Sequence, residues 1–95
     1  MDCRQVSFSG HAVRRMFERS ITRAEVLAAV AIGETIEAYP DDVPFPSVLL
    51  LARVQQRVLH LVVAQDRESG DCYLVTVYPP DPVLWEPGFR ARRSS

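Results

Sequence analysis

The stretch "SITRAEVLAAVAIGETIEAYP", residues 20–40, contains the point at which the sequence pattern changes from helix to strand. "TRAE" has the spacing of a capping box, in which the Thr22 hydroxyl accepts from the Glu25 amide and the Glu25 side chain reaches back. The apolar run that follows ends at Gly33, a common helix terminator because glycine tolerates positive φ. "ETIEAY" alternates and stops at Pro40. The stretch therefore predicts a largely buried helix followed directly by a strand.

A second helix is predicted upstream, within "SFSGHAVRRMFERSIT", residues 7–22. Ser9 is placed to cap its start. At helical spacing its polar side chains share one side and its apolar side chains the other. The apolar side comprises Ala12, Val13, Met16 and Phe17. Residues 1–8 form an N-terminal segment or a short strand.

Downstream of Pro40 the pattern is that of a sheet. Three runs rich in β-branched and aliphatic residues, 47–54, 58–65 and 73–78, are joined by short polar links. Short links favour antiparallel pairing. Residues 83–95 form a C-terminal tail. The prediction is one α+β domain over residues 1–95, with two N-terminal helices packed on one face of a mainly antiparallel sheet of about four strands.

Composition restricts the functional classes. With 47% hydrophobic residues in a chain of 95, the sequence is that of a folded domain. The net charge of −1 gives no overall basic character. All eleven basic residues are Arg, which suits bidentate contacts to phosphate and carboxylate. A GC-rich genome would produce the same bias.

The two cysteines, Cys3 and Cys72, predict neither a disulfide framework nor a zinc site. The start "MDCRQVSF" lacks the apolar core of a signal peptide. The longest apolar runs are far below the roughly 20 residues that cross a bilayer. We therefore expect a cytoplasmic protein without membrane contact. No metal or other cofactor is expected, because no phosphate-binding loop, HExxH or CxxC motif is present.

Three side chains at i, i+4 and i+8 of the first helix, His11, Arg15 and Arg19, form one stripe. An imidazole can transfer a proton, and two guanidinium groups can hold a phosphate or stabilise an oxyanion. A solvated helix face, with Glu18 paired to a neighbouring Arg, explains the same pattern.

The last predicted strand contributes Thr76 and Tyr78, which alternate onto one face together with Leu74. The Tyr78 hydroxyl could contact a phosphate or a ribose, although such residues also favour strands for packing reasons. His60 lies among aliphatic residues and is either a hydrogen-bonded sheet residue or a secondary site candidate. In the tail, Trp85 is expected to pack on the core.

The tail arginines Arg90, Arg92 and Arg93 remain candidates for gripping phosphates.

The elements H-A-x-x-R-M-x-E-R and T-V-Y-x-P-D-x-x-x-W occur here in that order. Together they resemble the bacterial family called domain of unknown function 4258, from His11 to Arg93. The family pattern matches His11, Arg15, Glu18, Arg19, His60, Thr76, Tyr78, Trp85, Arg92 and Arg93. Ser20 departs from it, because the family often has glycine there.

The resemblance implies a fold like that of the small RelE, BrnT and MqsR toxins, with two helices against a curved sheet. It also implies a toxin of a type II toxin–antitoxin pair, with a zinc-finger antitoxin of the MqsA type as partner. Such toxins are metal-independent ribonucleases that act on free or ribosome-bound mRNA.

The leading hypothesis is a metal-independent endoribonuclease in which the ribose 2′-hydroxyl attacks the adjacent phosphorus. Its catalytic candidates are His11, Arg15, Arg19 and Tyr78, and its substrate-binding candidates are His60, Thr76, Arg92 and Arg93. The alternative is a non-catalytic RNA- or protein-binding module of the same fold, which the near-neutral charge favours. An orphan domain without activity fits equally well. Convergence of these side chains is expected only for the enzyme.

Overall fold

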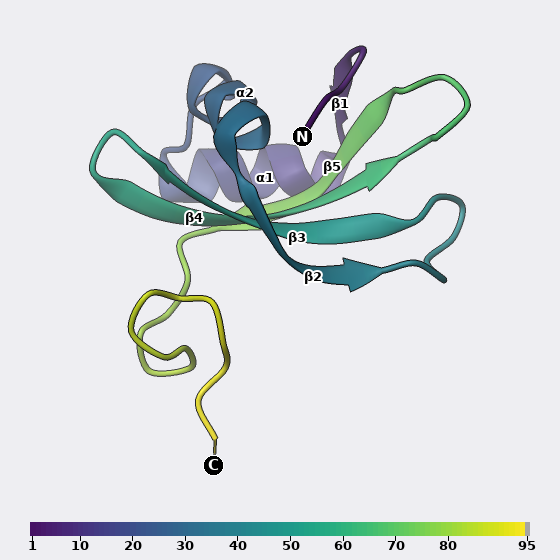
Figure 1. Ribbon diagram of the computed structural model, residues 1–95. Helices are drawn as coiled ribbons and strands as arrows, with labels where there is room; N and C mark the ends of the chain where they lie inside the picture. The colour runs from purple at the N-terminus through teal and green to yellow at the C-terminus, as the bar shows by residue number, and fades with distance from the viewer. Residues whose placement is uncertain (95) are drawn as a thin grey trace.

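The structure, a computed structural model, describes residues 1–94 (Figure 1). Its elements in chain order are β1 (Val6–Phe8), α1 (Gly10–Arg19), α2 (Arg23–Ile32), β2 (Glu34–Tyr39), β3 (Ser47–Val54), β4 (Arg57–Gln65) and β5 (Cys72–Tyr78). The predicted α+β class with two helices is confirmed. In the described part of the chain, neither helix has the length and apolar character needed to cross a membrane.

The sheet has five strands in the order β1-β5-β4-β3-β2, one more than the predicted four. Strands β2 to β5 form the expected antiparallel series, whereas β1 pairs parallel to β5 with Val6 opposite Cys72. The sheet is therefore mixed. The β1–β5 pairing joins distant parts of the chain, so no local turn signal in the sequence predicts it. The β3–β4 hairpin turns at Gln55 and Gln56, both with positive φ.

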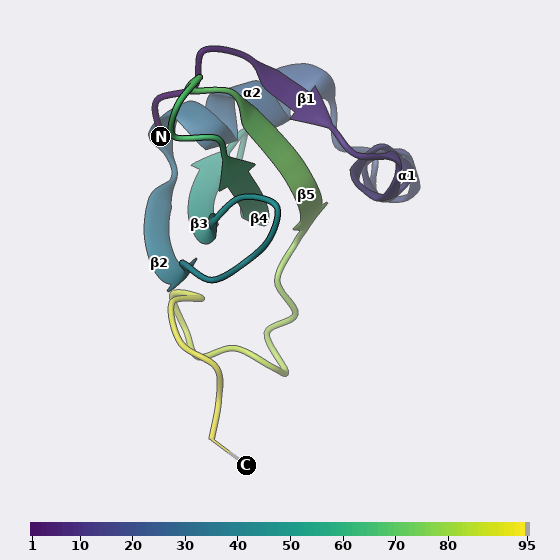
Figure 2. The same cartoon turned by 90° about the vertical axis from the view of Figure 1, so that its right-hand side faces the viewer.

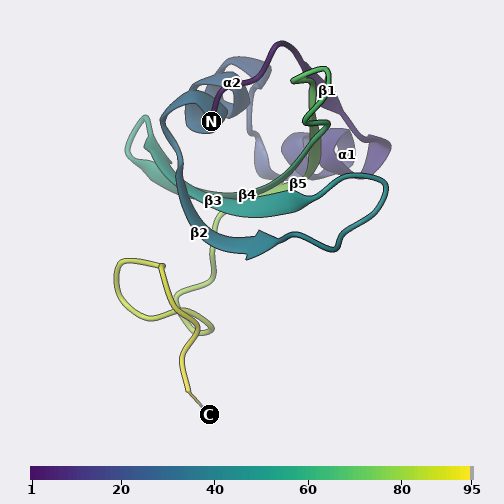
Figure 3. The ribbon, with the colours of Figure 1, turned by 45° about the vertical axis from the view of Figure 1, so that its right-hand side comes forward.

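The sheet curves around α2 on one side, and the C-terminal tail lies on the other (Figures 1 and 3). As predicted, α2 is the more buried helix, with Val26, Ala29 and Val30 in the core. In contrast, α1 lies beside β5 at the edge of the sheet (Figure 2).

The predicted apolar side of α1 is only partly buried. Ala12 is fully buried and Met16 packs against the core. Val13 and Phe17, however, are 52% and 89% exposed. The apolar side of α1 is therefore wider than its buried stripe, because a helix alongside a sheet edge buries a narrower stripe than one lying across a sheet face.

The capping box at the start of α2 is confirmed. The Thr22 amide donates to Glu25 Oε1 at 2.9 Å, and the Glu25 amide donates to Thr22 Oγ1 at 3.1 Å. The hydrogen bond from the Thr22 amide lowers the pKa of Glu25. The prediction that Gly33 ends α2 because glycine tolerates positive φ is wrong, since the φ of Gly33 is −62°. Glycine is needed there because a Cβ would lie 2.7 Å from the Ala29 carbonyl oxygen.

Ser20, where the family often has glycine, has a backbone conformation that is unfavourable for serine. Ser20 ends α1 in the left-handed region, with φ 53° and ψ 45°, where glycine is favoured. We expect Ser20→Gly to raise the free energy of unfolding by roughly 0.5 to 1 kcal/mol. Urea denaturation followed by circular dichroism measures this change. Ser20→Ala keeps the Cβ and is the control; an equal gain in both variants would contradict this explanation.

Cys3 and Cys72 form a disulfide across 69 positions of sequence, contrary to the expectation from their spacing. The parallel pairing of β1 with β5 brings the two segments together. Arg4 strengthens the same junction, because its guanidinium contacts the Asp71 carboxylate at 2.7 and 2.9 Å. The N-terminal segment is thus fastened covalently to the strand that carries Thr76 and Tyr78.

Candidate functional site

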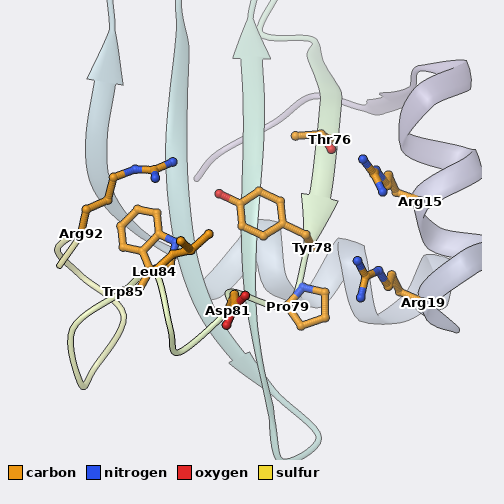
Figure 4. Close-up of a pocket in the computed structure, with 9 residues that line it drawn as sticks. All are labelled: Arg15, Arg19, Thr76, Tyr78, Pro79, Asp81, Leu84, Trp85 and Arg92. Atoms are coloured by element: carbon orange, nitrogen blue, oxygen red, sulfur yellow. The ribbon is translucent and has the colours of Figure 1, made fainter. Parts of the chain in front are cut away.

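A cavity of about 420 Å³ opens between α1, the end of β5 and the C-terminal tail (Figure 4). It lies on the sheet face opposite α2. Its lining residues are Arg15, Arg19, Thr76, Tyr78, Pro79, Asp81, Leu84, Trp85 and Arg92. Three separate parts of the chain therefore contribute guanidinium or hydroxyl groups to one concave surface.

A bulge in β5 turns Thr76 and Tyr78 toward this cavity. Thr76 pairs with Val62 and Tyr78 with His60, but Leu74 pairs with Val63, so the register shifts between them. Leu74 belongs to the core on the α2 side. The prediction that Leu74 shares their face is wrong, because the bulge breaks simple alternation.

Helix α1 supplies the arginines on the other side of the cavity, and β5 fixes its start. The Ser9 amide donates to the Leu74 carbonyl at 3.1 Å, and the Ser9 hydroxyl donates to the Val75 carbonyl at 3.0 Å. His11 Nε2 then lies 3.1 Å from the Thr76 hydroxyl. His11 thus borders the cavity through Thr76.

Both arginines of the predicted stripe, Arg15 and Arg19, line the cavity. In Figure 4 both side chains extend from α1 toward β5. Arg15 also pairs with Glu18 at 3.6 Å, although both side chains are about half exposed, so this pair is weak. Arg15 therefore forms the expected pair with Glu18 and also lies, with Arg19, next to β5 in the cavity lining.

The tail provides the third wall. Trp85 is 4% exposed, so its predicted packing is confirmed, and its ring meets that of His60 edge to face at 4.4 Å. The Arg92 guanidinium lies 5.1 Å from the centre of the Trp85 ring, a cation–π distance that holds Arg92 at the cavity. Arg93 is directed elsewhere, to the Pro82 carbonyl at 2.9 Å and to Glu86 at 3.6 Å.

Arg90 also lies outside the cavity lining and pairs with Glu34.

His60 is fully buried behind Tyr78. Its Nε2 lies 2.8 Å from the Phe89 carbonyl oxygen, which can only accept, so Nε2 carries the proton. In neutral His60, Nδ1 is then an acceptor, and it lies 3.3 Å from the Tyr78 hydroxyl. Tyr78 therefore donates to His60 and leaves its oxygen lone pairs available to the cavity.

The pKa values of His60 and Tyr78 are shifted in opposite directions. Burial lowers the pKa of His60 and raises the pKa of Tyr78. The positive charge of Arg92 lowers the pKa of both, whereas the Glu37 carboxylate raises both. Both groups are therefore neutral at pH 7, in agreement with the hydrogen bonds.

Acid is expected to destabilise the fold through His60. Because its folded pKa is lowered, the folded state binds fewer protons than the unfolded state, so stability falls as pH falls below about 6.5. The free energy of unfolding should drop by up to about 1 kcal/mol between pH 7.5 and 5.5. Urea titrations across this range measure it. His60→Gln is the control, and an unchanged slope in that variant would exclude His60 as the cause.

The structure brings five predicted residues into one cavity lining: Arg15, Arg19, Thr76, Tyr78 and Arg92. His11 and His60 lie directly behind Thr76 and Tyr78 through hydrogen bonds, and Arg93 is elsewhere. Sequence reasoning missed Asp81 as a lining residue. Its signals were the turn-forming series "PPDP" and the Asp of the T-V-Y-x-P-D-x-x-x-W element. The Asp81 carboxylate caps that turn by accepting from the Val83 amide at 2.8 Å.

Among residues 1–94, no group of three or more His, Cys, Asp or Glu side chains is arranged to hold a metal ion. The polar groups that line the cavity are three guanidinium groups, two hydroxyls and the Asp81 carboxylate, and an imidazole contacts each hydroxyl. This set can bind an anion and move protons next to it.

Comparison with known proteins yields one match. The family model described as domain of unknown function (DUF4258) matches residues 8–79. No curated protein and no solved structure matches the chain. The matched range contains α1 and β5 but ends before the tail residues of the cavity. Because it covers well over half of the sequence, the chain belongs to the DUF4258 family.

Proposed function

We propose that the protein is an endoribonuclease that cleaves RNA without a metal ion, through attack of a ribose 2′-hydroxyl on the adjacent phosphorus. The observation that carries the proposal is the gathering of Arg15, Arg19 and Arg92 around the hydroxyls of Thr76 and Tyr78. Each hydroxyl contacts a histidine. The reaction needs these same kinds of group: cations for the phosphate oxygens, a base and an acid.

Tyr78 and His60 act as the base. The Tyr78 oxygen accepts the proton of the 2′-hydroxyl while the Tyr78 proton passes to His60 Nδ1. The 2′-oxygen then forms its bond to phosphorus. The lowered pKa of His60 keeps Nδ1 unprotonated before the reaction, and the Phe89 carbonyl stabilises the transient imidazolium.

The leaving group is handled from the opposite side. As the bond between phosphorus and the 5′-oxygen breaks, that oxygen takes a proton from protonated His11, relayed by the Thr76 hydroxyl. The products are a 2′,3′-cyclic phosphate and a 5′-hydroxyl. Arg15, Arg19 and Arg92 stabilise the charge that develops on the non-bridging oxygens.

The test is cleavage of a long mixed-sequence RNA in excess EDTA. Wild-type protein is compared with the double variant His11→Ala, Arg15→Ala. Arg67→Ala is the control for loss of an arginine away from the cavity, because Arg67 is exposed in the β4–β5 turn. We expect cleavage by wild type and Arg67→Ala but not by the double variant. Arg15→Lys should also lose activity, because the bidentate grip on phosphate is lost.

Equal cleavage by all the proteins would point to a contaminating nuclease and refute the proposed site. If purified wild type fails to cleave, the same comparison is made on mRNA bound to ribosomes. Failure of both substrates would overturn the enzyme proposal.

We also propose a role for the protein in the cell. Its substrate is cytoplasmic RNA, free or on ribosomes, and its partner is a cognate antitoxin, a zinc-finger protein of the MqsA type. The arrangement of two helices and a curved sheet supports placing the protein with RelE-like toxins of type II toxin–antitoxin pairs. The exposed Phe17 lies on the helix that carries Arg15 and Arg19, so a partner covering this helix could block the site.

The second candidate is a non-catalytic binding module. Val13 and Phe17 favour it, because they lie one helical turn apart, at 52% and 89% exposure, and adjacent exposed apolar side chains are typical of contact surfaces. In that case the cavity arginines bind RNA or a protein carboxylate without bond cleavage. RNA binding without cleavage in the assay above, abolished by the double variant, would identify this function.

A further inference from the structure

A second cavity, of about 430 Å³, lies on the same sheet face as the first. Its roof is the loop between β2 and β3, which arches past the ends of β3 and β4 in Figure 2. Its floor includes Ala64 and Tyr73, which are cross-strand partners, and Val75 from the bulge of β5. Nothing in the reaction proposed above uses this cavity.

Most of its lining is flat and apolar. The rings of Phe45 and Tyr73 stack with centroids 5.4 Å apart and planes only 10° from parallel. Val43 and Val75 remain 89% and 42% exposed around them. A small planar ligand with apolar faces would bury this surface, as single-stranded bases do on aromatic side chains.

The polar groups of the cavity lie at one place. The Ser47 hydroxyl donates to Asp42 Oδ2 at 2.5 Å, and Ser47 is 3% exposed whereas Asp42 is exposed. The hydrogen bond orients the carboxylate and leaves Oδ1 and a lone pair of Oδ2 free as acceptors. A carboxylate in this state accepts from paired N–H groups. Of the RNA bases, guanine presents such a pair, at N1 and N2.

The two cavities follow one another along β5, which contributes Tyr73 and Val75 to the second cavity and Thr76 and Tyr78 to the first. Because the bulge absorbs one residue, Tyr73 and Thr76 point to the same face although three positions separate them. Their partners on β4, Ala64 and Val62, are two residues apart, so at about 3.3 Å per residue the separation is roughly 7 Å along the strand. A dinucleotide can span it, with a phosphate near Thr76 and a base near Tyr73.

We infer that the second cavity is a nucleobase subsite that selects guanine near the phosphate bound at the first cavity. This inference rests on the proposed RNA substrate and defines it further as single-stranded, guanine-containing RNA. The Phe45 and Tyr73 rings hold the base through apolar and aromatic contact, and Asp42 reads its edge.

Binding of non-cleavable RNA tests this inference. The probes are fluorescein-labelled hexanucleotides of 2′-O-methyluridine, in which the methyl group blocks the attacking oxygen. One position at a time is replaced by guanine or by an abasic residue, and fluorescence anisotropy gives the affinity. At one position, removing the base should weaken binding by about 5- to 150-fold. Guanine there should bind at least about 5-fold more tightly than uracil.

Two variants assign the effect to the cavity. Phe45→Ala should remove the difference between base and abasic probes. Asp42→Asn should remove the preference for guanine, whereas Asp41→Asn, the neighbouring exposed carboxylate outside the lining, should retain it. Because Asp42→Asn is nearly isosteric, its result does not depend on the larger change at Phe45.

Each outcome separates the subsite from the catalytic proposal. The subsite is overturned if the affinity is the same whichever position is abasic, or if both variants keep the affinity difference between base and abasic probes. This holds even when unmodified RNA is cleaved. Base-dependent binding that both variants remove establishes the subsite even when no RNA is cleaved. No binding of any probe by wild type also overturns it.

Discussion

Tyr78→Phe is expected to reduce RNA cleavage by about 100- to 10,000-fold, the usual contribution of a general base. Phe keeps the ring that packs against His60 at 5.4 Å but removes the hydroxyl that connects the substrate to His60 Nδ1. The measurement is the initial rate on a labelled RNA in EDTA. RNA affinity should change far less than the rate, because the three arginines remain.

Tyr39→Phe is the matched control. Tyr39 also has a hydroxyl that is a donor, to Glu37 Oε2 at 2.8 Å, and burial with this contact raises its pKa to about 12. It does not line the cavity. Equal loss in the two variants would mean that a general change in the sheet, and not proton transfer by Tyr78, explains the effect.

Loss of the Cys3–Cys72 disulfide is expected to lower the free energy of unfolding by about 2 to 4 kcal/mol, because the bond closes a loop of most of the chain. For a chain of 95 residues this is a large share of the total stability. Guanidinium denaturation of wild type with and without reductant measures it. The proposed cytoplasmic location makes the reduced value important, because such bonds are rare there.

Cys3→Ser separates the bond from other effects of the reductant. Its stability should equal that of reduced wild type and should not respond to reductant. A midpoint for Cys3→Ser equal to that of oxidised wild type would show that Arg4, Asp71 and the β1–β5 pairing hold the junction without the bond.

Local signals in the sequence were sufficient for much of the fold. The capping box at Thr22 and Glu25 depends on residues three apart, so its geometry is readable directly. The same holds for the N-cap at Ser9, whose side chain accepts from the Ala12 amide. Helical spacing also predicted that Arg15 and Arg19 lie together, and both line the cavity.

Features that depend on distant pairing were not predictable in this way. The parallel β1–β5 pairing decides that Cys3 meets Cys72, and no residue near either cysteine encodes it. The bulge of β5 decides that Leu74 and Thr76 face opposite sides, which strict alternation does not allow. Arg92 and Arg93 are neighbours of the same type, and only the packing of Trp85 distinguishes their positions.

The sheet order has a consequence for the order in which the molecule assembles. Strands β2 to β5 are joined by local turns, so their pairings have a low loop-closure cost and are expected to form early. β1 must find β5 from the far end of the chain, and only then can Ser9 fix α1 against β5. The α1 half of the arginine cavity is therefore expected to form last during folding. In hydrogen exchange, amides of β1 and α1 should open before those of β3 and β4, so the cavity could be dismantled while most of the sheet remains folded.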